Sequence, residues 1–260
     1  MRPLTYSLLA ILLPVSADAA GIQLQPHRAV YELVMTRSSQ GSGVANASGA
    51  IFYEFAEACD GWKISNRTII RTLYEDGPER TSDWTYTSWE ARDGSSYRFS
   101  VESEVNGNSG EDIAGTAGAT GDGGEARFTA PEPQTVKLTP GTLFPTQHIE
   151  ALVEAAKAGE QFLLADVFDG FAADTPYYSI NAFIGPLKAP EADAKPGTDV
   201  GSWKMRLAFF DKNSQEEKPA YELGIRYFEN GVATEVLQDF GNMVIDGRLR
   251  EIELLPRPSC

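Results

Sequence analysis

Alternation of apolar and polar residues with a period of two is the feature of this sequence that most restricts its fold. Tyr97, Phe99 and Val101 alternate with polar side chains, and the same pattern recurs at 203–209 and 221–227. In an extended strand, this pattern places the apolar side chains on one face and the polar side chains on the other. A chain made of many such segments is expected to form an antiparallel sheet with one buried and one solvated face.

Further segments of this kind predict additional strands. They are 28–37, 47–55, 62–73, 81–91, 135–138, 161–168, 177–187, 232–240 and 242–255. Asn230-Gly231 and Asp93-Gly94 separate neighbouring strands, and these dipeptides tolerate the positive φ values of tight hairpin turns. Asp246-Gly247 predicts a turn or bulge in the last strand, and the glycine-rich stretch 106–124 predicts weak strands around a loop. The sequence is therefore predicted to be mainly β, a meandering antiparallel sheet in a barrel or sandwich.

One segment departs from the alternation and predicts a helix of about twelve residues near 146–158. Its apolar stripe consists of Ile149, Leu152, Val153 and Ala156. Thr146 is the predicted N-cap, and Gly159 has the residue type that commonly follows the end of a helix. Because so short a helix needs tertiary support, we expect its stripe to pack into the concave face of the sheet.

The N-terminus has the three parts of a secretory signal peptide. Arg2 supplies a positive charge, residues 7–15 form an apolar run, and Ala17-Asp18-Ala19 has the small residues that a signal peptidase requires. The run is too short to span a bilayer as a retained helix. We therefore expect a signal peptide at 1–19, cleavage after Ala19, and a periplasmic protein that forms a single domain over 20–260.

The chain contains two cysteines, Cys59 and Cys260. An oxidising compartment favours one intramolecular disulfide between them. That bridge would close a loop of about 200 residues and constrain the unfolded chain by about 5 kcal/mol in the chain-entropy model. Two free thiols, or a bridge between two molecules, are the alternatives.

The charge balance argues against several classes of partner. Lys and Arg number 22 and Asp and Glu number 37, for a net charge of −15. Nucleic acid and anionic lipid head groups attract clustered cations, so neither is an expected partner. No later segment is apolar enough to span a membrane. The only histidines, His27 and His148, lie far apart, and no zinc-binding spacing occurs, so no metal or other cofactor is predicted.

The catalytic signals are equally weak. No Gly-x-Ser-x-Gly motif occurs. His148 is the better candidate base, but its place at the start of the predicted helix favours capping or packing. The many acidic residues make any carboxylate pair uninformative. Trp84 and Trp89 are five residues apart, which places them on opposite faces of one strand, so that one of them either packs in the core or lines a rim. We predict no catalytic residues and no enzyme.

Two motifs carry a resemblance to a known family. Pro140-Gly-Thr-Leu-Phe-Pro-Thr-Gln-His148 precedes an alanine-rich helix, and Val167-Phe-Asp-Gly170 follows the next strand. With the signal peptide, Cys59 in its Cys-Asp-Gly-Trp turn and the terminal Cys260, they resemble the EipB family of cell-envelope integrity proteins over essentially the whole mature chain. Phe171 stands where that pattern has a small polar residue.

The resemblance implies a periplasmic protein of alphaproteobacteria. It implies a spiral-like, broken β-barrel with helical insertions, and a disulfide that maps onto Cys59 and Cys260. It also implies a role in keeping the envelope intact under stress, with no established enzymatic activity.

These observations predict a non-catalytic periplasmic protein that maintains envelope integrity through protein–protein interaction. The predicted partner is a periplasmic protein, with a helical-repeat protein as one candidate. The alternative is a periplasmic carrier or binder of an apolar ligand, such as a lipid or a lipoprotein acyl chain, because a curved sheet with a helix in its mouth suits an apolar pocket. An enzyme acting on the envelope polymer is a third, weaker hypothesis.

Overall fold

The computed structural model of this chain describes residues 22–173, 177–212 and 214–260. The predicted signal peptide and its cleavage after Ala19 lie outside the described residues.

Within these residues the chain forms one antiparallel sheet and one α-helix. The first half of the sheet contains β1 (His27–Ser38), β2 (Val44–Glu57), β3 (Gly61–Tyr74), β4 (Arg80–Ala91), β5 (Ser96–Val105), β6 (Asn108–Ser109), β7 (Ile113–Thr120), β8 (Gly123–Ala130) and β9 (Gln134–Leu138). The second half contains β10 (Phe162–Val167), β11 (Tyr178–Ile184), β12 (Ser202–Asp211), β13 (Tyr221–Phe228), β14 (Ala233–Asp239) and β15 (Met243–Leu254). The period-two segments therefore form strands as predicted, and the glycine-rich stretch supplies β6, β7 and the start of β8.

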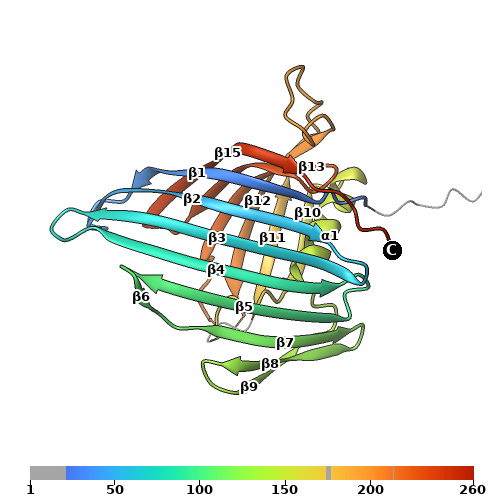
Figure 1. Ribbon diagram of the computed structural model, residues 1–260, viewed down its shortest axis with the longest axis horizontal. Helices are drawn as coiled ribbons and strands as arrows, with labels where there is room; N and C mark the ends of the chain where they lie inside the picture. The colour runs from blue at the N-terminus through green and yellow to red at the C-terminus, as the bar shows by residue number, and fades with distance from the viewer. Residues whose placement is uncertain (1–21, 174–176, 213) are drawn as a thin grey trace, which may run out of the picture.

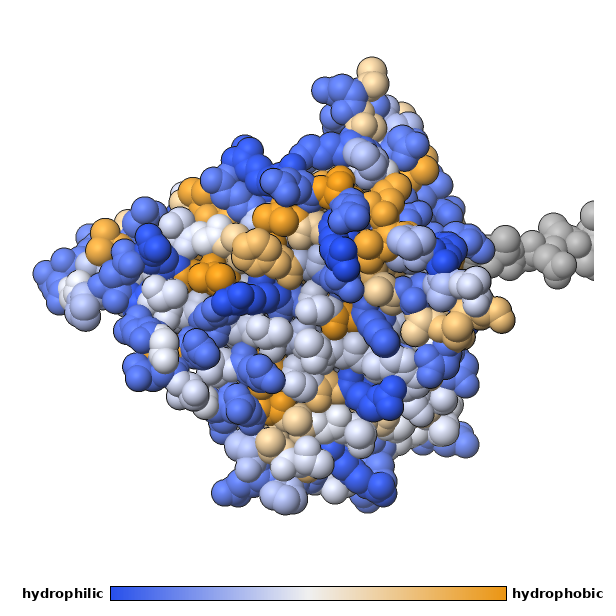
Figure 2. Space-filling model, in the orientation of Figure 1, coloured by the Kyte–Doolittle hydropathy of each residue, from blue (hydrophilic) through white to orange (hydrophobic). Residues whose placement is uncertain are grey.

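The strands form an antiparallel meander. The last strand, β15, pairs with the first, β1, so both chain ends lie in the middle of the strand order. Hydrogen-bonded neighbours run from β10 through β14 to β15, which pairs with β1, and then from β2 to β9. Figure 1 shows β1 to β9 as a front wall and β10 to β13 as a wall behind it. The outward face of the front wall is mostly hydrophilic, with scattered apolar residues (Figure 2).

The turn chemistry is confirmed at two hairpins and wrong at a third position. Gly94 (φ +66°) and Gly231 (φ +78°) occupy the turns before β5 and β14. Gly247, in contrast, lies inside β15 and pairs with Leu33 on β1 and Val236 on β14. A Cβ at 247 would lie 2.9 Å from Leu33 Cδ2 and 3.1 Å from the carbonyl oxygen of Val236. This glycine therefore permits close packing between two strands and makes neither the turn nor the bulge predicted there, since the register with β1 shifts only between Val30 and Tyr31 and between Met35 and Arg37.

The sheet does not close, because β9 and β10 lie at opposite ends of the strand order. One parallel bridge joins Leu143, just after β9, to Val167 at the end of β10. Leu143 N donates to the carbonyl of Asp166 at 2.9 Å, and Phe168 N donates to the carbonyl of Leu143 at 3.0 Å. The predicted broken, spiral-like barrel is confirmed.

Helix α1 (Pro145–Lys157) lies between the two walls (Figure 1). It begins one residue after the N-cap Phe144, so the prediction of Thr146 as N-cap is wrong. Pro145 has no N–H to satisfy and suits the first helical position. The helix ends as predicted before Gly159 (φ +80°). Its Leu152, Val153 and Ala156 pack in one cluster with residues of β11 and β12, among them Ile180, Ala182, Trp203 and Met205.

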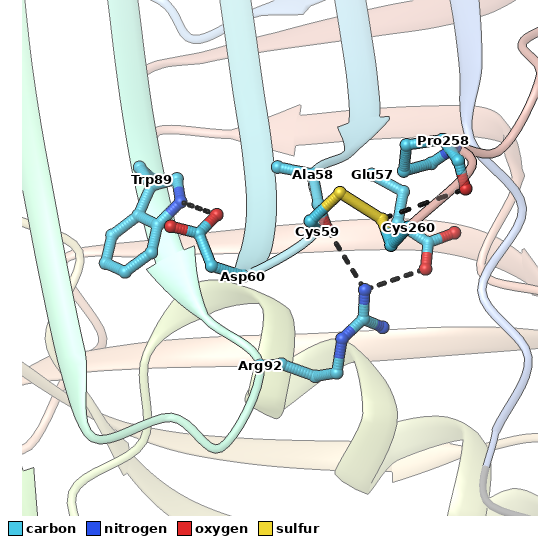
Figure 3. The surroundings of a disulfide bond; sticks show 8 residues. All are labelled: Glu57, Ala58, Cys59, Asp60, Trp89, Arg92, Pro258 and Cys260. Atoms are coloured by element: carbon cyan, nitrogen blue, oxygen red, sulfur yellow. Dashed lines mark hydrogen bonds and ion pairs between the residues drawn. A yellow bond between two sulfur atoms is a disulfide. The ribbon is translucent and has the colours of Figure 1, made fainter.

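A disulfide joins Cys59, in the turn between β2 and β3, to Cys260 (Figure 3), with the Cα atoms 5.7 Å apart. Arg92 donates to Glu57 Oε1 at 2.8 Å and to the carbonyl of Ala58 at 3.1 Å in the same turn. Arg257 Nη1 lies 2.5 Å from Glu57 Oε2. The C-terminal tail is thus held to the end of β2 by a covalent bond and by a shared carboxylate.

Candidate functional site

The two motifs of the sequence analysis meet inside the concave face. The Leu143–Val167 bridge places Phe144 beside Phe168, and both side chains are fully buried. The Tyr97 ring stacks on Phe144 with the centroids 4.8 Å apart. Aromatic side chains bury large areas, so this cluster makes the two motifs a part of the core.

The second motif is held at a place where a side chain would not fit. Gly170 has φ +69°, and a Cβ there would lie 2.4 to 2.8 Å from ring carbons of Phe99. Before it, the carbonyl of Asp169 accepts hydrogen bonds from the hydroxyls of Tyr86 at 3.2 Å and Tyr97 at 3.0 Å. These two hydroxyls also lie within hydrogen-bonding distance of each other, and with one proton each they make two of the three bonds at a time. Tyrosines of β4 and β5 therefore fix the Phe-Asp-Gly turn.

The N-terminus of α1 is capped by a residue 56 positions away in the sequence. Glu90 of β4 is 2% exposed. Its Oε2 accepts from Thr146 N at 2.7 Å, and its Oε1 accepts from Gln147 N at 2.9 Å. A carboxylate at this position satisfies free helical N–H groups and faces the positive end of the helix dipole. Burial nevertheless raises the pKa of Glu90 to about 7, although the two amide bonds act in the opposite direction.

Sequence analysis missed Glu90 as a site residue. One signal was present, because residues 84, 86, 88 and 90 share one face of β4 and Tyr86 is a core residue. An acid in phase with a buried tyrosine indicates a buried carboxylate that requires partners. Nothing in the local sequence identifies the helix that supplies them.

His148 lies one turn into α1 and is buried. Its Nε2 has no hydrogen-bond partner among the described residues. Desolvation lowers the pKa of His148 to about 4, which makes the imidazole neutral at pH 7. The buried position fits the packing role that the sequence favours for this residue.

The two tryptophans of β4 lie on opposite faces, as their spacing predicts. Trp84 packs against the core cluster formed by residues of β1, β2, β3 and β15. Trp89 faces outward, where the guanidinium of Arg98 lies 4.1 Å from its ring centroid and its Nε1 donates to Asp60 Oδ1 at 3.3 Å. Trp89 and Asp60 lie close to the disulfide (Figure 3).

An apolar row is exposed on the outside, at the open end of the sheet. It consists of Phe162 and Leu164 on β10, Phe183 on β11 and Leu187 just beyond β11. Phe162 and Phe183 are paired across the two strands, with their ring centroids 5.5 Å apart. We call these four residues the edge row.

Two other classes of site do not occur in the part of the chain that the structure covers. No group of three or more His, Cys, Asp or Glu side chains is placed there to hold a metal ion. The described helix is also not long and apolar enough to cross a membrane.

Comparisons with known proteins agree with this architecture. The chain is 28% identical over 245 residues to the cell envelope integrity protein EipB of Brucella abortus (strain 2308), covering 92% of this chain and 87% of that protein. It also matches the crystal structure of a β-barrel-like protein of a domain of unknown function from Brucella abortus. That match has a TM-score of 0.84 and 26% identity, and it covers 91% of this chain and 100% of the other. A profile of the EipB-like family matches residues 18–256, so this chain belongs to the EipB-like family.

Proposed function

We propose that this protein is a non-catalytic periplasmic protein that maintains envelope integrity by holding a partner protein at the free edge of β10. The name of the Brucella abortus relative supports the role in envelope integrity. The Cys59–Cys260 disulfide supports an oxidising compartment such as the periplasm. Burial of His148, which also lowers its pKa and makes it a weak base, supports a role without general-base chemistry.

The observation that carries the proposal is the coincidence of an apolar row with an unpaired strand edge. Phe162 is 64% exposed and Leu164 is 71% exposed. Up to Val167, no strand or bridge of the described chain pairs with the outer edge of β10. An exposed, apolar edge strand is a template for pairing, and natural proteins usually protect one.

The backbone groups at this edge of β10 are also available for pairing. The carbonyl of Gln161 accepts from Ile184 N of the β11 side, whereas the carbonyl of Asp166 accepts from Leu143 N on the other side. Since these groups alternate along a strand, the N–H and C=O of Phe162 and Leu164 face the free edge. An added strand would find hydrogen-bond partners there, and its side chains would meet the edge row.

The charge of the chain favours a different protein over a second copy. With a net charge of −15 on each copy, self-association would bring like charges together. Glu160, exposed just before β10, adds a local negative charge. The partner that fits is an extended segment with apolar side chains at alternate positions and a basic residue at one end.

The interior offers less support for the apolar carrier. The concave side holds α1 and the cluster around Phe144, Phe168 and Tyr97, which are fully buried. A lipid chain would have to displace these side chains. The apolar residues that solvent already reaches at the edge row favour the protein partner.

Replacing Leu164 with aspartate is expected to abolish function without loss of folding. The charge would face an incoming apolar strand, whereas in the free protein it would meet only water. In a strain lacking the native gene, Leu164→Asp should leave survival of envelope stress at the level of the empty vector in colony counts. Loss of the apolar contact should weaken binding of the partner strand about tenfold or more, which is about 1.4 kcal/mol.

Phe52→Asp is the matched control, because Phe52 is another exposed apolar residue but lies on β2, which is paired on both sides. It should behave as wild type, and both variants should keep the wild-type melting temperature. Full complementation by Leu164→Asp would refute the proposal. Lipid in native mass spectra of purified wild-type protein would favour the carrier instead.

A further inference from the structure

The segment 185–201, between β11 and β12, projects beyond the sheet (Figure 1). We call it the arch, because both of its ends and its middle are tied down. At the start, Lys188 exchanges backbone hydrogen bonds of 2.8 and 3.0 Å with Ser202. In the middle, Lys195 Nζ donates to the carbonyls of Leu249 at 3.0 Å and Arg250 at 2.7 Å on β15. The arch is thus fixed over the strands that it crosses.

A cavity of about 580 Å³ lies between the arch and the outer side of β13, β14 and β15. Its walls combine charged side chains with apolar residues, among them Pro190 and Phe228. Cavities of this volume hold small-molecule ligands. Because the arch is anchored on both sides of the cavity, the space exists before any ligand arrives.

Arg226 of β13 lines this cavity and is only 8% exposed. Its Nε donates to Glu235 Oε1 at 2.8 Å, and its Nη1 lies 3.4 Å from Ser202 Oγ. A guanidinium has five N–H donors, and no hydrogen bond from Nη2 occurs within the described residues. A buried arginine therefore presents free donors at the wall of a preformed cavity.

Arg226 shares its acidic neighbours with other cations, Glu235 with Lys204 and Glu191 with Lys188. Glu235 Oε2 lies 2.8 Å from Lys204 Nζ, so one carboxylate serves two cations. Lys195 is bound to carbonyl oxygens and adds a second positive charge at the wall.

The remaining charges of the cavity come mostly in pairs. Asp246 pairs with Arg248 at 3.0 Å, and Lys188 pairs with Glu191. Asp193 supplies one further negative charge to the lining. A strongly charged anion such as phosphate would be repelled by these carboxylates. A ligand with a single carboxylate could bind Arg226 through it and place a positively charged group at Asp193.

We infer that this cavity, the arch site, binds the carboxylate end of a short peptide. The free Nη2 of Arg226 donates to the carboxylate, and a guanidinium is well suited to this planar group. Asp193 receives an ammonium group or a backbone N–H of the same peptide, and the apolar wall takes a small side chain. The arch site is lined by none of the edge-row residues, although Leu187 of that row lies in the arch, and the inference does not depend on the proposed function.

Peptide binding to the purified mature protein tests the inference. The probe is a mixture of Ala-Xaa-Ala tripeptides with free carboxylates, observed by ligand-detected NMR, and the same mixture with C-terminal amides is the comparison. We expect binding by the free acids, at least tenfold weaker binding by the amides, and no competition from inorganic phosphate at equal concentration.

Three variants locate the binding. Arg226→Gln should weaken binding at least tenfold, and Arg206→Gln, which removes an exposed arginine paired with Glu222 outside the cavity, should not change it. Glu235→Gln frees Arg226 from its partner and should strengthen binding, so the inference stays testable if Arg226→Gln does not fold. Equal binding of acids and amides, an unaffected Arg226→Gln, or no binding tighter than about 1 mM by any tripeptide would overturn it.

Discussion

Replacing Cys59 with serine is expected to lower the free energy of unfolding by about 5 kcal/mol, the largest effect of any single change considered. The bridge joins residues that are 201 positions apart, so without it the unfolded chain gains the entropy of a very long open loop. Urea unfolding of the wild type, Cys59→Ser, Cys260→Ser and the double variant measures the change. All three variants should give the same free energy, because one cysteine without its partner contributes no crosslink.

A control separates the covalent bond from the other contacts of the tail. Arg257 donates to Glu57 and to the carbonyl of Leu24 at 2.6 Å, and both contacts hold the tail against the sheet. Arg257→Ala removes them and keeps the disulfide, and we expect it to cost about 1 kcal/mol as an exposed ion pair with one hydrogen bond. If Cys59→Ser cost no more than Arg257→Ala, the entropic role of the bridge would be wrong.

The second large effect concerns Glu90 and pH. The pKa of Glu90 is about 7 in the folded protein, against an ordinary value of 4.5. The folded state therefore binds this proton more tightly than the unfolded state. The resulting stability, about 3 kcal/mol, is fully present below pH 4.5 and is lost as the pH rises through 7. This dependence is opposite to that of a carboxylate in a strong ion pair.

His148 has the opposite dependence in nearly the same pH window. Its pKa falls from 6.5 to about 4 on folding, because burial disfavours the imidazolium. Its contribution, again about 3 kcal/mol, is present above pH 6.5 and is lost as the pH falls towards 4. Between pH 4.5 and 6.5 the two contributions offset each other. We expect stability to change little there, apart from smaller effects of Asp169, whose pKa is raised, and His27, whose pKa is lowered.

Single variants should reveal how each of the two groups changes the free energy of unfolding with pH. In Glu90→Gln, only His148 remains of the pair, so the free energy of unfolding should fall as the pH drops from 6.5 to 4.5. In His148→Leu, only Glu90 remains, so the free energy of unfolding should rise as the pH drops from 6.5 to 4.5. Urea unfolding at half-unit pH steps gives both profiles, with Glu154→Gln, an exposed acid of α1, as the control. If the free energy of unfolding of both variants changed with pH as it does in the wild type, the proposed offset between Glu90 and His148 would be wrong.

Much of the fold can be predicted from the sequence, because strand faces, turns and helix ends depend on residues that are close together in the chain. The alternation around Tyr97 and Phe99 assigns each side chain to a face of its strand, since backbone geometry fixes that period. The two turns and the helix end require positive φ, which Gly94, Gly231 and Gly159 adopt without steric cost. The apolar stripe of α1 predicted burial, and the two cysteines allowed one intramolecular pairing.

The wrong or missing predictions share a different cause, namely contacts between distant segments. Thr146 has the residue type of an N-cap, but the carboxylate of Glu90 arrives from β4 and takes over that function. Gly247 has the residue type of a turn, but pairing with β1 and β14 continues through it. In both cases local preferences of about 1 kcal/mol are outweighed by tertiary packing and hydrogen bonding.

The same distinction between local pattern and distant contacts applies to the candidate sites. The sequence by itself determined that this chain is a meandering sheet with one helix and one possible intramolecular disulfide, because periodicity and residue counts are properties of the chain alone. Only the tertiary structure decided that β10 ends the sheet with its apolar residues exposed. It also decided that the arch encloses Arg226. The period of a strand tells which face a side chain takes, but which segments become neighbours depends on how the whole sheet curls.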